Sequence, residues 1–262
     1  PKIGILLAWF ATPSAAAKAM DPDVRHELGE MIKLSSNEAA TRFSRELGLA
    51  RVQAVLDAHG FYDAKRGGGI WFGKHYGRDS ERVRDPVGGN THAATVRQLL
   101  RFYLLLEQDR LVSPEASAAM RDIFLSPGIP HIEDRFVKGL AGREREIRRK
   151  SGWWEQWSHD TAEVTGGGRH YILVALTRHP RGTAYLEALA PALDDALGAD
   201  YVRVDGCFAG SGVDVSGVAV ARGVSTGVAP IWVNAEGENC IVVVPGANET
   251  VTAAGVEAER AV

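Results

Sequence analysis

The sequence contains little of several features that would point to a specialised class of protein. Only two of its 262 residues are cysteine, which excludes a disulfide scaffold and a four-thiolate zinc site. The apolar run from Ile3 to Phe10 is too short to span a bilayer, and no other uninterrupted run approaches the required length. The formal net charge is −3, so no overall positive field favours nucleic acid as a partner. We therefore predict neither a membrane span nor a nucleic-acid partner.

What is present is typical of a folded globular protein. Hydrophobic residues make up 45% of the chain and charged residues 24%, which argues against wholesale disorder and against a coiled-coil rod. The chain starts at Pro1 and not at methionine. We therefore expect an N-terminally truncated chain, and any export signal would lie upstream, so the sequence leaves the localisation and the oligomeric state open.

The composition changes near residue 205. No lysine follows Lys150, and valine occurs 12 times in residues 1–204 but 13 times in residues 205–262. Residues 205–262 also contain both cysteines, and their Val-rich segments separated by glycines predict short strands. We therefore predict two domains, at 1–204 and 205–262, the second a β-rich fragment.

Residues 1–204 combine helix signals with one hairpin signal. Capping residues and apolar spacing predict a helix that opens at Pro22 and has apolar positions as far as Ile32, and further helices over 36–47, 49–59, 95–108, 114–124 and 183–197. Two strand patterns, at 154–165 and 170–177, flank the triplet Gly166-Gly167-Gly168, which suits an antiparallel hairpin. The fold class we predict is α+β, a helical domain with a small antiparallel sheet.

Three short segments become informative when they are taken together. Lys2 precedes an apolar helix, Ser35-Ser36-Asn37 joins two helices, and Lys150-Ser151-Gly152 begins the first strand of the predicted hairpin. In this order they resemble the S-x-x-K, S-D-N and K-T-G motifs of the penicillin-recognising serine hydrolases, that is, class A β-lactamases and DD-peptidases. Ser36 stands where the family has Asp, and Ser151 where it has Thr. The resemblance covers residues 1 to about 200 and implies the β-lactamase/transpeptidase-like fold.

The resemblance also implies roles for these residues. A serine hydroxyl becomes a good nucleophile when a base takes its proton, and Lys2 would be that base if burial and a second cation, Lys150, lower its pKa. Ser35 would pass a proton to the leaving nitrogen, and Asn37 would bind the substrate amide and hold the lysine. Lys150 and Ser151 would bind the substrate carboxylate. The strand after Gly152 would pair with the substrate and supply an oxyanion-hole N–H, because Gly152 allows a close approach.

Two departures from the family pattern affect the predicted activity. The nucleophilic serine would lie two positions before Pro1 and is absent from this chain, so we expect the chain as given to be inactive as an acyl-transfer enzyme. No deacylation pattern follows Asn37, and Glu81 is the only glutamate in the corresponding stretch, residues 67–86. The predicted substrate is a small molecule or peptide with a carboxylate. The first function is a serine hydrolase acting on an amide, and the alternative is a non-catalytic binding protein of the same fold.

The aromatic, histidine and basic residues outside these motifs have less specific interpretations. Strand alternation is expected to place some of Trp153, Trp154 and Trp157 in the core and one, assigned here to Trp153, toward the substrate. The basic run 143–150 contains two glutamates and is expected to be a solvated loop or strand edge. No cofactor or metal is predicted, because the histidines are spread without metal-binding spacing: His75, His92, His131, His159, His170 and His179.

The last part of the chain resembles a different family. Residues 212–252 contain Ser225-Thr226-Gly227, Gly237-Glu238-Asn239 and Pro245-Gly246-Ala247-Asn248 in the order found in ribokinase-like sugar kinases. The sugar motif and the catalytic aspartate segment of that family are missing, so no kinase activity is assigned. A fragment of a sugar kinase joined to an unrelated front domain is the third interpretation of the chain.

Overall fold

Helix α1 (Lys2–Phe10) lies at the centre of the first of two units, Pro1–Ala190 and Pro191–Val262, into which the chain divides. All nine residues of α1 are buried in the computed structural model, which describes residues 1–77, 81–198, 231–233 and 239–241. A helix that is buried on every side needs no polar face, which explains the unbroken apolar sequence. Trp9 of this helix packs edge-on against Phe43, with ring centroids 4.7 Å apart.

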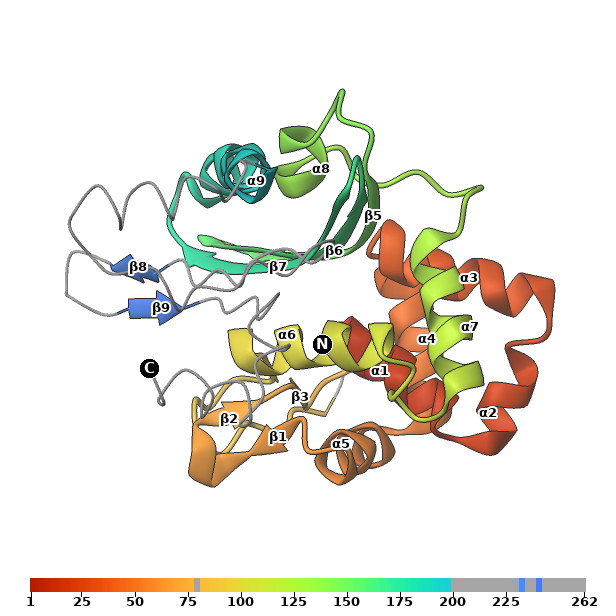
Figure 1. The fold of residues 1–262 in the computed structure, drawn as a ribbon. Helices are drawn as coiled ribbons and strands as arrows, with labels where there is room; N and C mark the ends of the chain where they lie inside the picture. The colour runs from red at the N-terminus through yellow and green to blue at the C-terminus, as the bar shows by residue number, and fades with distance from the viewer. Residues whose placement is uncertain (78–80, 199–230, 234–238, 242–262) are drawn as a thin grey trace, which may run out of the picture. The chain divides into compact units, whose positions relative to one another are not determined.

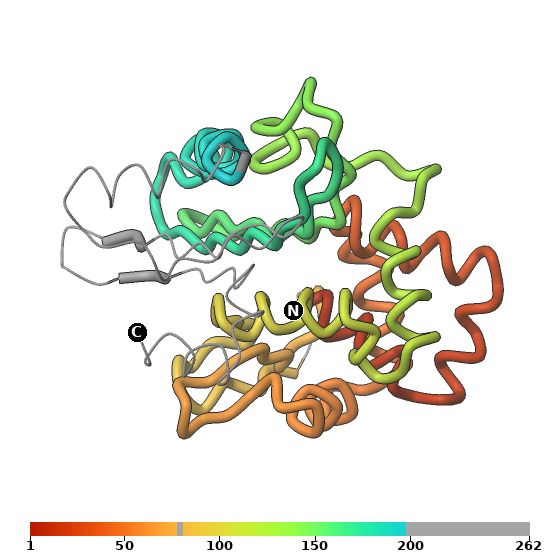
Figure 2. Tube along the Cα trace, viewed as in Figure 1, coloured from red at the N-terminus to blue at the C-terminus, as the bar shows by residue number. Residues whose placement is uncertain are grey.

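Several helices of the first unit pack against α1. They are α2 (Pro13–Lys18), α3 (Pro22–Lys33), α4 (Asn37–Leu47), α5 (Leu49–Ala58) and α7 (Pro114–Leu125) (Figure 1). Helix α6 (Val96–Glu107) packs against α7 and the sheet. The starts of α3, α6 and α7 are set by local caps, because the side chains of Asp21, Thr95 and Ser113 each accept a hydrogen bond from a backbone N–H in the first turn. The helices predicted at these positions are confirmed. Figure 2 follows the chain from these helices (red to yellow-green) into the sheet (green to cyan).

A three-stranded antiparallel sheet forms the other part of the unit. Its strands are β5 (Glu146–Trp154), β6 (Trp157–Gly166) and β7 (Arg169–Arg178), in the order β5-β6-β7. Helix α6 packs on one face, whereas α8 (Arg135–Gly139) and the start of α9 (Gly182–Gly198) lie on the other (Figure 1). The predicted α+β class is therefore confirmed.

The hairpin predicted around Gly166-Gly167-Gly168 is confirmed as β6 and β7, but the prediction that Lys150-Ser151-Gly152 begins its first strand was wrong. Lys150, Ser151 and Gly152 belong to β5, a separate edge strand that ends at Trp154, and a tight turn then leads into β6. Glu155 adopts φ 51° in this turn, a conformation that the sequence does not signal because no Gly or Asn stands there. Most of the basic run lies in this edge strand, so the strand-edge alternative is confirmed, but the run is not solvated throughout, since Arg149 is 1% exposed and bonds to Asp160.

The core position expected for some of the tryptophans was also wrong. Trp153, Trp154 and Trp157 are 73%, 68% and 42% exposed, because they lie at the tip of the β5–β6 turn. The buried residues of this sheet lie instead toward its middle, as Ala162, Val164 and Val174 show.

Shorter elements complete the description. Strands β1 (Tyr62–Asp63) and β2 (Gly68–Gly69) flank the 3-10 helix η1 (Ala64–Arg66), and β3 (Trp71–Phe72) pairs with β4 (His92–Ala93). Within the second unit, β8 (Ile231–Val233) pairs with β9 (Asn239–Ile241) in antiparallel fashion. The predicted boundary at 204/205 and most of the kinase-like segment lie outside the described residues. None of the helices in the described ranges is long and apolar enough to cross a membrane.

Candidate active site

Lys2 is the buried centre of the candidate site. Only 4% of it is exposed, and its Nζ donates to the Ser35 carbonyl, to Ser35 Oγ at 3.0 Å and to Asn37 Oδ1 at 2.7 Å. Burial lowers the pKa of Lys2 from 10.5 to about 7. A lysine with such a pKa is partly neutral near pH 7 and can accept a proton.

The segment between α3 and α4 presents two polar side chains to Lys2. Ser36 is the N-cap of α4, because its Oγ accepts from Ala39 N at 3.1 Å. This cap places Asn37 in the first turn of α4, and it leaves Ser35 just outside the helix with φ 57°. A left-handed conformation is costly for any residue with a Cβ, so local strain accompanies the orientation of Ser35.

Lys150 reaches the same hydroxyl from the sheet. Its Nζ donates to Ser35 Oγ at 3.0 Å and to the Ser151 carbonyl at 2.5 Å. Burial, followed by the nearby charges of Lys2 and Arg149, holds the pKa of Lys150 well below its usual range. Ser35 Oγ therefore lies between two amino groups, one from α1 and one from β5, although the two residues are far apart in the sequence.

The charges at the site are unbalanced. No hydrogen bond or ion pair in the described ranges joins a carboxylate to Lys2 or Lys150, whose acceptors are all neutral oxygens. A bound anion would favour the protonated form of both lysines, so the site can accept a negatively charged group.

The supporting strand is held firmly. Thr161, the partner of Lys150 in the sheet, donates from Oγ1 to the Lys150 carbonyl at 2.8 Å and bonds to Tyr103 of α6 at 2.9 Å. The neighbouring Arg149 makes a two-oxygen contact with Asp160, at 2.7 and 2.8 Å, and also bonds to Asp134. These contacts fix β5 on both sides of the sheet.

The remaining predicted residues follow Lys150 along β5. An added Cβ at Gly152 would meet no atom within 4 Å, so the space beside this residue is open. Ser151 and Trp153 share one face of the strand, and Lys150, Gly152 and Trp154 share the other. The assignment of Trp153 to substrate binding therefore stays a prediction. Glu81, the only glutamate suggested for deacylation, is exposed.

Sequence reasoning missed an aromatic stack beneath Lys2. The Tyr76 ring centroid lies 4.5 Å from Lys2 Nζ, and the His92 ring stacks on Tyr76 at 4.8 Å. Burial lowers the pKa of His92 to about 4, so its ring is neutral and adds no charge at neutral pH. Burial also raises the pKa of Tyr76. No spacing in the sequence signals this stack, since these residues come from a loop and the short strand β4.

A hollow opens beside Asn37 and Tyr76. Its volume is about 450 Å³, and it is lined by Asn37, Glu38, Thr41, Arg42, Arg45 and Tyr76. Two arginines in this lining add to the positive character of the surroundings, although Arg42 is paired with Glu27.

Comparison with solved structures finds proteins of the same fold. The β-lactamase from Sphaerobacter thermophilus superimposes with a TM-score of 0.54 at 17% identity, covering 76% of this chain and 80% of that one. A structure of PBP-A gives a TM-score of 0.54 at 18% identity, over 74% and 78% of the two chains. At these identities the likeness shows the fold alone.

Among curated proteins, the chain is 25% identical over 154 residues to the DNA replication and repair protein RecF of Pseudomonas putida. This alignment covers 59% of this chain, which spans only 42% of the length of that relative. The sequence profile of the β-lactamase enzyme family matches residues 12–196, which is more than half of the chain. The match includes Ser35, Asn37 and Lys150, so the chain belongs to the β-lactamase enzyme family.

Proposed function

We propose that the chain provides the proton-transfer and carboxylate-binding groups of a serine acyl-transfer site that acts on an amide, either a β-lactam or a peptide. The observation that carries this proposal is the position of Ser35 Oγ, 3.0 Å from both Lys2 Nζ and Lys150 Nζ. An oxygen between two amino groups of lowered pKa is suited to pass a proton from one group to another.

The proposed steps follow from these contacts. Neutral Lys2 takes the proton of the nucleophilic serine as that oxygen attacks the carbonyl carbon and forms the acyl bond. Protonated Lys2 then donates to Ser35 Oγ, and the Ser35 hydroxyl proton goes to the leaving nitrogen. Lys150 and Ser151 hold the substrate carboxylate, and the edge of β5 beside Gly152 pairs with the substrate backbone.

The proposed acyl-transfer step requires a nucleophilic serine that is not among the 262 residues given. The S-x-x-K pattern places it three positions before Lys2, which is two positions before Pro1. We therefore propose that the 262-residue chain binds a carboxylate-bearing amide without forming an acyl-serine.

The test compares three forms of the protein. One is the chain as given, one begins with Ser-Ala before Pro1, and the matched control begins with Ala-Ala. Each is incubated with a fluorescent penicillin, and the covalent adduct is measured by intact mass. We expect stoichiometric labelling of the Ser-Ala form alone. Absence of labelling there, or equal labelling of the Ala-Ala form, would contradict the acyl-transfer proposal.

The non-catalytic alternative is tested with the chain as given. A peptide with a free C-terminal carboxylate should raise its melting temperature, whereas the same peptide with a C-terminal amide should not, because the two lysines lack a counter-ion. Equal effects of the two peptides would show that the site does not recognise carboxylate.

A further inference from the structure

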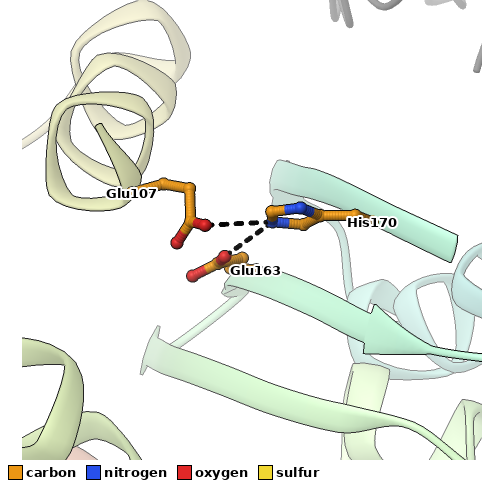
Figure 3. Close-up of side chains that lie close together, drawn as sticks. All are labelled: Glu107, Glu163 and His170. Carbon is orange, nitrogen blue, oxygen red and sulfur yellow. Dashed lines mark hydrogen bonds and ion pairs between the residues drawn. The ribbon is translucent and has the colours of Figure 1, made fainter. Parts of the chain in front are cut away.

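We propose that Glu107, Glu163 and His170 form a binding site for a divalent transition-metal ion, Zn²⁺ in the first place. The three residues come from the last turn of α6, from β6 and from β7, and their side chains converge (Figure 3). One ligand atom of each lies within 4.8 Å of the other two. This cluster is separate from the lysines of the candidate active site, and the proposal does not depend on the proposed function.

The spacing of the three ligand atoms suits a small ion. His170 Nε2 lies 2.8 Å from Glu163 Oε1 and 3.8 Å from Glu107 Oε1. A tetrahedral zinc ion with bonds of about 2.1 Å separates its ligands by about 3.4 Å, which falls between these two distances. Small side-chain adjustments would therefore give the required geometry, and imidazole with carboxylate oxygen is a donor set that zinc accepts.

The other carboxylate oxygens are already occupied. Arg148 NH1 lies 3.0 Å from Glu163 Oε2 and 3.5 Å from Glu107 Oε2. The guanidinium thus holds the far side of both carboxylates and leaves their Oε1 atoms directed at His170. An arginine in this place orients the ligands without taking the position of the ion, as groups next to bound metals commonly do.

The charge of the cluster also favours a cation. Two carboxylates face a single guanidinium, which leaves excess negative charge when both are ionised. A divalent ion would neutralise this charge, and the C-terminal end of α6 contributes further negative potential.

One ligand of the proposed site is buried and the other two are partly exposed to solvent. The Glu163 side chain is fully buried in the sheet, whereas Glu107 and His170 are 35% and 49% exposed. An ion can therefore enter from solvent and keep a water molecule as its fourth ligand. It would tie α6 to the β6–β7 hairpin, two residues along β6 from Thr161, which holds the Lys150 carbonyl.

The test measures metal binding by the whole chain after Cys207 and Cys240 are replaced by serine, so that thiolates do not compete. Zn²⁺ is titrated calorimetrically, and Co²⁺ is used as a spectroscopic substitute. The variants are Glu107→Gln and His170→Ala, both at partly exposed positions. The matched control is His26→Ala, which removes the histidine of another His–Glu pair, with His26 Nε2 3.7 Å from Glu30 Oε1.

We expect one equivalent of Zn²⁺, a rise in melting temperature with metal concentration, and visible Co²⁺ absorption bands. Glu107→Gln and His170→Ala should each weaken binding by at least about tenfold, and His26→Ala should leave it unchanged. Circular dichroism of the metal-free variants establishes that they remain folded. Absence of stoichiometric binding, or binding unchanged in both cluster variants, would overturn the proposal.

Discussion

Replacing Lys2 by methionine should change how the stability of the protein depends on pH. Lys2 has a pKa of about 7 in the folded protein because it is buried, against an ordinary value of 10.5. Between these values the unfolded chain binds a proton at this position that the folded chain lacks. The free energy of unfolding therefore increases as the pH rises from about 7 toward 10.5. Below about pH 7, burial of protonated Lys2 destabilises the folded protein most.

The size of the effect follows from proton linkage. One additional proton bound by the unfolded state changes the free energy of unfolding by about 1.4 kcal/mol for each pH unit. Over the window from 7 to 10.5 the accumulated change is on the order of 5 kcal/mol. Lys150 contributes in the same direction, since its pKa is also lowered.

The assay is urea unfolding followed by circular dichroism at a series of pH values from 7 to 10. In the middle of the window, the parent protein should show a slope of stability against pH steeper by about 1.3 kcal/mol per unit than that of Lys2→Met. Lys65→Met is the matched control, because Lys65 is exposed and should leave the slope unchanged. Equal slopes for the parent and Lys2→Met would refute a lowered pKa at Lys2.

Substitutions at three other positions test the geometry of the site. Ser35→Gly should be more stable than Ser35→Ala by about 1 kcal/mol in urea unfolding, because both lack the hydroxyl and only glycine adopts φ 57° freely. Gly152→Val should keep the melting temperature, since an added Cβ meets no atom within 4 Å, but should slow penicillin labelling of the serine-extended form by at least about tenfold. Asp160→Asn should destabilise the protein by about 3–5 kcal/mol in the same unfolding assay, because it breaks the ion pair with buried Arg149. Equal stability of the two Ser35 variants would contradict the strained conformation of Ser35. Unchanged labelling of Gly152→Val would contradict substrate binding beside Gly152, and an unchanged stability of Asp160→Asn would contradict the importance of the ion pair with Arg149.

Most helices of the first unit, though not α2 and α8, could be predicted because their signals are local. Asp21 before Pro22, Thr95 and Ser113 before Pro114 each cap the helix that follows, so the sequence marks the first turn directly. Apolar spacing then predicts the buried face, as Leu99, Phe102, Tyr103 and Leu106 of α6 confirm.

The sheet was harder to predict because its determinants are not local. Arg148 and Arg149 look like solvated residues in the sequence, yet their charges are paired with Glu163 and Asp160 of the neighbouring strand. Only the register of the sheet brings these partners together. The turn at Glu155 carries no Gly, Asn or Pro, so the end of β5 could not be recognised.

The candidate site likewise combines residues in local sequence motifs with residues that only the fold brings together. The three motifs lie in short segments, and their order predicted that Lys2, Ser35, Asn37 and Lys150 would meet. The contacts among these side chains are present in the structure. The aromatic stack beneath Lys2 and the cluster around His170 could not be predicted, because their members are separated along the chain and belong to no motif.

Adjacent residues on β5 show how the fold keeps an unpaired cation in place. Arg149 is neutralised by Asp160 and Asp134 and fixes the strand, whereas Lys150 on the other face has only neutral acceptors. A substrate carboxylate would supply the missing negative charge. The rise in melting temperature caused by a carboxylate-terminated peptide should therefore be largest below pH 7, where Lys2 is protonated, and should decline as the pH rises through 7. A peptide effect that grows with pH would show that the lysines are not its binding partners.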